Sequence, residues 1–197
     1  EGIRRRTERG REMELKSVDA SRASKHLPMR VPENIAKAEN LFTIVSHLNM
    51  GREPHPDKET AYCLSNINYH AGNKALDSLA IEAANEYFKL SRELLPEDCW
   101  EDEHYNRTFK IFQKAAKTEL MCGNYENSEK LISELLRHAK TDLDKAECLA
   151  EQTTSLSSTG NFIKAIETAN RGLSYFHKQI PDNPEEANRK RKELMMQ

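Results

Sequence analysis

A short turn that recurs after 37 residues is the feature that most constrains the fold of this chain of 197 residues. It reads Gly123-Asn124-Tyr125 at its first occurrence and Gly160-Asn161-Phe162 at its second. A small side chain, Ser128 or Ala165, lies three residues after each aromatic ring. Glycine permits the positive φ of a tight turn, and a small residue lets two helices approach closely. We expect the ring to pack across the corner, so the pattern predicts helix pairs joined by short turns.

Apolar residues at steps of three and four predict amphipathic helices along most of the chain. The expected helices cover Pro32–Leu48, Asp57–His70, the stretch from there to Leu95, Glu103–Met121, Tyr125–Ala139, Leu143–Ser158 and Phe162–His177. A turn or kink is expected at Ala71-Gly72-Asn73, between the second helix and the third. The side chains of the last helix that are expected to face inward are Ile163, Ile166, Ala169, Leu173 and Phe176. Strands are scarcely signalled, so the predicted fold is all-α, with about seven helices in antiparallel pairs.

Composition divides the chain into four parts. Residues 1–31 are basic and contain few large apolar residues, so we expect disorder or a frayed helix there. Residues 32–56 hold a first helix and a connector with two prolines. Residues 57–180 are the predicted repeat domain, and residues 181–197 form a charged C-terminal tail. The chain begins with Glu rather than Met, which favours a fragment of a longer protein.

The third helix resembles the second helix of a tetratricopeptide repeat, which has a small residue, an aromatic residue, another small residue and a terminal proline. Ala84, Phe88, Ser91 and Pro96 supply these positions, at spacings of four, three and five. The first helices lack the Trp and Leu-Gly positions of a strong repeat. The resemblance implies an α-solenoid, whose stacked pairs leave a concave groove that commonly holds peptides. An irregular helical bundle is the alternative fold.

Five motifs together resemble the helical region of one group of very large signalling proteins. They are Leu41–Gly51 (LFTIVSHLNMG), Ile67–Ala75 (INYHAGNKA), Leu94–Trp100 (LLPEDCW), Glu119–Tyr125 (ELMCGNY) and Ala165–Glu167 (AIE). Proteins of this group combine a protein-kinase-like domain, a STAND-type AAA ATPase, a tetratricopeptide-like region, a GAF domain and a histidine kinase. The resemblance covers about residues 40 to 181 and implies signal relay between the ATPase and kinase parts. ATPase and kinase motifs are absent from this sequence, so no catalytic residue is carried over.

The sequence contains no catalytic, cofactor-binding or metal-binding motif, so we expect that the chain is not an enzyme. Gly72-Asn73-Lys74 lacks the preceding strand and the run of amides of a phosphate loop. The seven histidines include no pair at positions i and i+4. Ser46-His47 resembles a phosphoacceptor box of histidine kinases, but Leu48 replaces the acidic residue of that box.

Charge and cysteine usage indicate the kind of partner and the compartment. The net charge of −2 predicts no strong general attraction to nucleic acid or to an acidic membrane, so we expect a protein partner. The spacing of the four cysteines suits neither a metal knuckle nor a disulfide framework, which favours reduced thiols in a cytoplasmic protein. Trp100 is expected to pack its loop onto the second repeat. The alternative is that Trp100 is exposed and contacts a protein partner.

Three hypotheses about function remain. The first is a non-catalytic helical-repeat module that mediates interaction or signal relay in a large ATP-binding sensor kinase. Its partners are then neighbouring domains or another protein. The second is a free-standing adaptor that binds a peptide in its concave groove. The third assigns ATPase or histidine kinase activity to a full-length parent protein and not to this segment.

Overall fold

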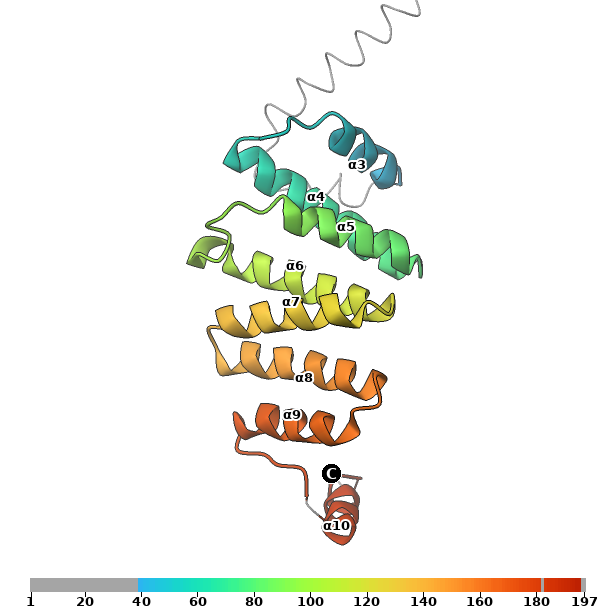
Figure 1. The fold of residues 1–197 in the computed structure, drawn as a ribbon, viewed down its shortest axis with the longest axis vertical. Coiled ribbons are helices and arrows are strands. Elements are labelled where there is room, and N and C mark those ends of the chain that lie inside the picture. The colour runs from blue at the N-terminus through green and yellow to red at the C-terminus, as the bar shows by residue number, and fades with distance from the viewer. Residues whose placement is uncertain (1–38, 182, 196–197) are drawn as a thin grey trace, which may run out of the picture. The chain divides into compact units, whose positions relative to one another are not determined.

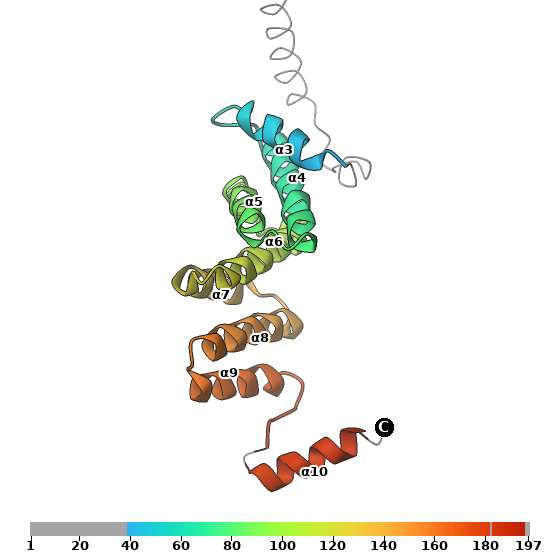
Figure 2. The same cartoon turned by 90° about the vertical axis from the view of Figure 1, so that its right-hand side faces the viewer.

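The computed structural model describes residues 39–181 and 183–195, in which every regular element is a helix (Figures 1 and 2). The helices are α3 (Leu41–Met50), α4 (Lys58–Asp77), α5 (Ile81–Glu93), α6 (Asp102–Met121), α7 (Tyr125–His138), α8 (Asp142–Ser158), α9 (Phe162–Ser174) and α10 (Pro184–Met195). The all-α prediction is confirmed for this part of the chain, and α10 lies in the expected charged tail. The expected basic segment 1–31 and the predicted helix start at Pro32 lie outside the described residues.

The chain divides into two compact units, Glu1–Ile111 and Phe112–Gln197. The boundary falls inside α6, so the first half of this helix belongs to the first unit and the second half to the second unit. The expectation of one repeat domain over residues 57–180 therefore stays a prediction.

In the first unit, α4 and α5 form a helix pair around a contact between a glycine and a phenylalanine. Gly72 lies in the interior of α4, so the turn expected at Ala71-Gly72-Asn73 is wrong. A Cβ atom at position 72 would lie 2.7 Å from Cε1 of Phe88, closer than carbon atoms approach, because the buried ring fills that space. Ser65 and Ser91 reinforce the pair, since each hydroxyl donates to the carbonyl oxygen of the other residue at 2.7 and 2.8 Å.

The chain reverses direction between α4 and α5 at Leu79, which adopts a left-handed conformation with φ 59°. The amides of Leu79 and Ala80 donate to carbonyls of the last turn of α4, both at 2.9 Å, in the Schellman pattern of helix ends. Gly123 (φ 80°) and Gly160 (φ 79°) occupy the same place in the same hydrogen-bond pattern after α6 and α8. The repeat predicted from two glycine turns therefore has a third, earlier member, in which leucine replaces glycine.

α3 packs on α4 through an apolar cluster and one pair of amides. The fully buried residues of the cluster are Leu41, Val45, Cys63, Ile67 and Ala71. Asn68 of α4 is also fully buried, and its side chain exchanges two hydrogen bonds of 2.9 Å with the side chain of Asn49 in α3. Because an unpaired buried amide destabilises the fold, this exchange fixes the position of α3 along α4.

The first half of α6 packs onto α4 and onto the loop that follows α5. The ring of Tyr62 stacks on the ring of His104, with centroids 4.0 Å apart. The Thr108 hydroxyl donates a hydrogen bond of 2.6 Å to the carbonyl oxygen of Cys99 in that loop. These contacts join α6 to the start of α4 and to the loop after α5.

In the second unit, small residues again join neighbouring helices. The Ser128 hydroxyl of α7 donates a hydrogen bond of 2.8 Å to the carbonyl oxygen of Ala116 in α6. A Cβ atom at Gly172 of α9 would lie 3.4 Å from Cβ of Leu149 in α8. Both positions are buried, so the close approach of helices that small residues were expected to permit is present in both pairs.

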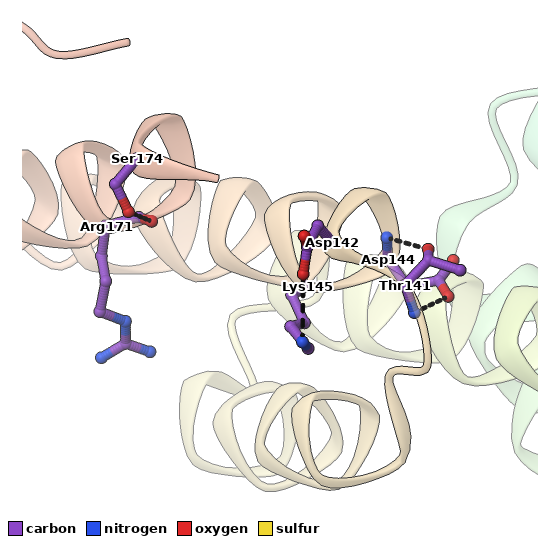
Figure 3. A network of polar contacts seen from close by, with 6 residues as sticks. All are labelled: Thr141, Asp142, Asp144, Lys145, Arg171 and Ser174. Carbon is purple, nitrogen blue, oxygen red and sulfur yellow. Dashed lines mark hydrogen bonds and ion pairs between the residues drawn. The ribbon is translucent and has the colours of Figure 1, made fainter. Parts of the chain in front are cut away.

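A capping box fixes the start of α8, as Figure 3 shows from close by. The amide of Asp144 donates to Oγ1 of Thr141, and the amide of Thr141 donates to the carboxylate of Asp144, both at 3.0 Å. Lys145 pairs with Asp142 at 3.2 Å, and its Nζ lies 5.5 Å from the ring centroid of Tyr175. The first turn of α8 is thereby joined to the residues that follow α9.

Most of the apolar stripe of α9 lies at the surface, so the expectation that Ile163, Ile166 and Phe176 face inward is wrong, whereas Ala169 and Leu173 are partly buried. The exposed side chains are Phe162, Ile163, Ile166 and Phe176, with 64, 77, 53 and 46% of their full accessible area. α8 covers only the face of α9 that carries Ala165 and Gly172, both of which are buried. The side chain of Tyr125 is 42% exposed, and the expectation that the aromatic rings of the repeated turns pack across their corners stays a prediction.

Candidate interaction surface

An open groove of about 460 Å³ runs between α8 and α9 in the second unit. Its lining is mostly apolar and consists of Leu143, Ala146, Glu147, Leu149, Ala150 and Thr153 of α8, of Ala169, Gly172 and Leu173 of α9, and of Phe176 just after α9. The exposed side chains of Phe162 and Ile166 lie on the same stripe of α9. A groove with such a lining suits the apolar side chains of another helix.

The groove exists because α9 carries a small side chain where the other helix pairs carry a large one. The position in question lies four residues after the small residue that marks the second helix of each pair. It is Phe88 in α5 and Ile132 in α7, and both side chains are buried. In α9 the same position is Ala169, which lines the groove. The absence of a large side chain there leaves unfilled volume between α8 and α9.

One carboxylate of α8 lines the groove. Glu147 is exposed and accepts a hydrogen bond of 3.3 Å from Gln113. Glu151, one turn further along, is partly buried and is not among the residues that line the groove. Burial raises the pKa of its carboxyl group, and the charges of Lys117 and Lys114 oppose this shift. The exposed carboxylate of Glu147 favours a partner with positive charge.

A second surface, which is polar, follows α4 in the first unit. Arg107 of α6 lies over the ring of Tyr69, 5.2 Å from its centroid. Burial, and to a smaller extent the charge of Arg107, lowers the pKa of His70. One turn earlier, Asn66 is buried, and its side-chain oxygen has no hydrogen-bond partner within the described part of the chain. Because this oxygen is buried, only the exposed groups around Arg107 and Tyr69 are open to a partner.

The predicted repeat positions lie in four kinds of place. Gly72, Ala84, Phe88, Ser91, Ser128 and Ala165 are buried in helices, Gly123 and Gly160 form turns, Pro96 follows α5, and Tyr125 and Phe162 are exposed. Trp100 is partly buried, with its ring 6.2 Å from that of Tyr105 in α6, and its role as a partner contact stays a prediction. Sequence reasoning missed the groove at Ala169, although a comparison of the residues four positions after each small residue contains the signal.

Burial suppresses the reactivity of two thiols. It raises the pKa of Cys63 to about 11 and the pKa of Cys148 to about 12. Since the thiolate is the nucleophile, both thiols are unreactive in the folded state. Within residues 39–181 and 183–195, no three His, Cys, Asp or Glu side chains are placed to hold a metal ion. Nor is any helix of that part of the chain long and apolar enough to cross a membrane.

Comparison with known proteins relates the sequence of this chain to a signalling protein. No protein-family model matches the chain, and no solved structure matches it. Over 136 residues, the chain is 31% identical to hybrid signal transduction histidine kinase G of Dictyostelium discoideum. This similarity relates the chain to a signalling histidine kinase. The match covers 65% of the chain but only 4% of the kinase, so it does not test the tetratricopeptide-like or STAND-ATPase parts of the resemblance.

Proposed function

We propose that residues 40–181 form a non-catalytic, tetratricopeptide-like module for protein interaction and signal relay within a large sensor kinase. The similarity to a signalling histidine kinase supports the setting. The single observation that carries the interaction role is the exposed apolar surface of α9 with its adjoining groove. Soluble domains rarely leave a contiguous apolar surface uncovered unless another molecule or domain binds it.

Two features of the helix pairs support a tetratricopeptide-like stack of the α-solenoid type. The same Schellman turn recurs after α4, α6 and α8. Gly72 lies in the first helix of its pair, where the repeat pattern has a glycine, and it supplies a position that the sequence pattern seemed to lack. Ala84, Phe88, Ser91 and Pro96 then follow in the order of the pattern.

A segment replacement in the Dictyostelium kinase tests the relay role. One variant carries residues 39–181 of this chain in place of the matched segment, and a second carries a flexible linker of the same length. We expect stimulus-dependent phosphorylation of the kinase to persist in the first variant and to be lost in the second. Equal signalling by the linker variant would refute a relay role for this segment.

The non-catalytic part of the proposal is tested on the purified chain with Mg²⁺ and radiolabelled ATP. We expect no release of phosphate above the buffer rate and no label on the protein. Hydrolysis or autophosphorylation would locate an activity of the parent protein in this segment and contradict the proposal.

A free-standing peptide-binding adaptor is the second candidate, and the polar surface of α4 favours it. Arg107 over Tyr69 offers a polar contact to an extended peptide. The full-length transcript separates the two candidates. A start codon directly before Glu1 and a stop codon directly after Gln197 would favour the adaptor.

A further inference from the structure

We propose that the α8–α9 groove binds a basic amphipathic helix of a protein partner, with an aromatic side chain of that helix inserted over Ala169. This inference rests on the proposed interaction function and adds the chemistry of the partner. It follows from three properties of the second unit: the element that covers the equivalent face of α7, the depth of the groove, and the charge at its border.

The element that covers the equivalent face of α7 is a helix. α8 packs against α7, and Nε2 of Gln152 in α8 donates a hydrogen bond of 3.2 Å to Glu129 in α7. The position of α9 that corresponds to Glu129, 37 residues later, is Ile166, which is exposed. By analogy with α8 on α7, a helix of the partner fits the exposed face of α9. The side of that helix that contacts α9 must be apolar, because Ile166 of α9 takes the place of the carboxylate Glu129 of α7.

The depth of the groove selects for a large side chain. Ala169 takes the place that Phe88 fills in the α4–α5 pair, and the groove of about 460 Å³ lies over it. An aromatic side chain of the partner would fill this volume from outside, as Phe88 fills the equivalent volume from within. Aromatic residues in such pockets contribute most of the binding energy of many interfaces.

The charge at the border selects for lysine or arginine on the partner. Glu147 lines the groove, is exposed, and would lie beside the flank of a helix that occupies it. The same carboxylate would repel an anionic lipid surface. A second copy of α9 offers no complementary cation, because Lys164 and Arg171 lie on the side of that helix opposite Ile166. A basic amphipathic helix is thus the occupant that suits all three properties.

A set of synthetic helical peptides tests the proposal by fluorescence anisotropy with the full chain. The parent peptide, of about 18 residues, has leucine at heptad positions a and d, one central phenylalanine on that stripe, and lysine on its flanks. We expect saturable binding of this peptide. Replacement of the phenylalanine by alanine should weaken binding about tenfold, and replacement of the lysines by glutamates should weaken it at least about tenfold. A peptide with the same residues in scrambled order should not bind.

Variants of the chain locate the binding site. Ala169→Phe fills the groove from inside and should weaken binding of the parent peptide at least about tenfold. Ala83→Phe, the same change at an exposed alanine of α5, is the matched control and should leave binding unchanged. Glu147→Lys should weaken binding of the lysine peptide and strengthen binding of the glutamate peptide. Loss of folding cannot produce this second result, which is a gain of affinity.

Three results would overturn the proposal: equal binding of the scrambled peptide, undiminished binding to the Ala169→Phe variant, or a homodimer that Ile166→Glu dissociates. Light scattering after size-exclusion chromatography detects the dimer, and a dimer would make a second copy the occupant. The proposed function fails separately, in the segment replacement. If that replacement supports signalling while the peptides do not bind, the interaction function stands and the basic helix is wrong.

Discussion

The helix pairs α4–α5 and α8–α9 share a turn and a pattern of small residues, yet only the first pair has a filled interface. In α4–α5, the ring of Phe88 lies directly against Gly72. In α8–α9, the corresponding positions, 81 residues later, are Ala169 and Thr153, and both line an open groove. One backbone arrangement therefore forms either a filled core or an open groove, according to the size of the side chains at these two positions.

The comparison also predicts how stability is distributed along the chain. α4 is buried along most of its length, between α3, α5 and the first half of α6. α9 buries only Ala165 and Gly172 and exposes its large apolar side chains. Regions with fewer buried apolar contacts open more readily, so α8–α9 should unfold locally before α4–α5.

The largest difference between the pairs should appear when the same side chain is removed from each. Phe88 is fully buried, whereas Phe162 is 64% exposed. Phe88→Ala should lower the free energy of unfolding by about 3–5 kcal/mol, because it removes a buried ring and leaves a cavity. The matched variant Phe162→Ala should change it by less than about 0.5 kcal/mol. Urea unfolding followed by circular dichroism measures both. Similar losses in the two variants would contradict the difference in packing.

A smaller effect tests the contact between Gly72 and Phe88 itself. Gly72→Ala should destabilise the chain by about 1–3 kcal/mol, because the added methyl group overlaps the ring. In the Phe88→Ala background, the same change should instead stabilise the chain by about 0.5–1 kcal/mol, since alanine is the better helix former. Urea unfolding of the four proteins gives the coupling energy. An equal effect of Gly72→Ala in both backgrounds would show that the ring does not require the glycine.

The two buried thiols report the local stability of the two pairs. Cys63 lies in α4 and Cys148 in α8, and the pKa of each is raised by burial, so both react only when their region opens. In a Cys99→Ala, Cys122→Ala background, Cys148 should react with a thiol reagent about tenfold faster than Cys63 at native conditions, a difference of about 1.4 kcal/mol in opening. Mass spectrometry of quenched samples measures both rates. Equal rates would mean that the units open together.

The sequence predicted the helices well where a local pattern exists and failed where a distant contact decides. The all-α class and the turns at Gly123 and Gly160 follow from local periodicity and from the preference of glycine for positive φ. Gly72 was misread as a turn, because its cause is the ring of Phe88, which lies in another helix. The stripe of α9 was predicted to be buried, because amphipathicity shows that a face is apolar but does not show what covers it.

The sequence does not predict the turn at Leu79, because leucine has no preference for the positive φ that it adopts there. Substitutions at this turn should give the smallest of the four effects. Leu79 is 82% exposed and holds a left-handed conformation that costs a non-glycine residue about 1–2 kcal/mol. Leu79→Gly should therefore stabilise the chain, by less than about 1 kcal/mol because glycine also gains freedom in the unfolded state. Gly160→Ala, at the equivalent position, should destabilise it by about 1 kcal/mol, and nothing lies near the added methyl group to alter that cost. Thermal and urea unfolding of the two variants measure both changes. If both substitutions changed stability in the same direction, the two turns would not share one backbone conformation.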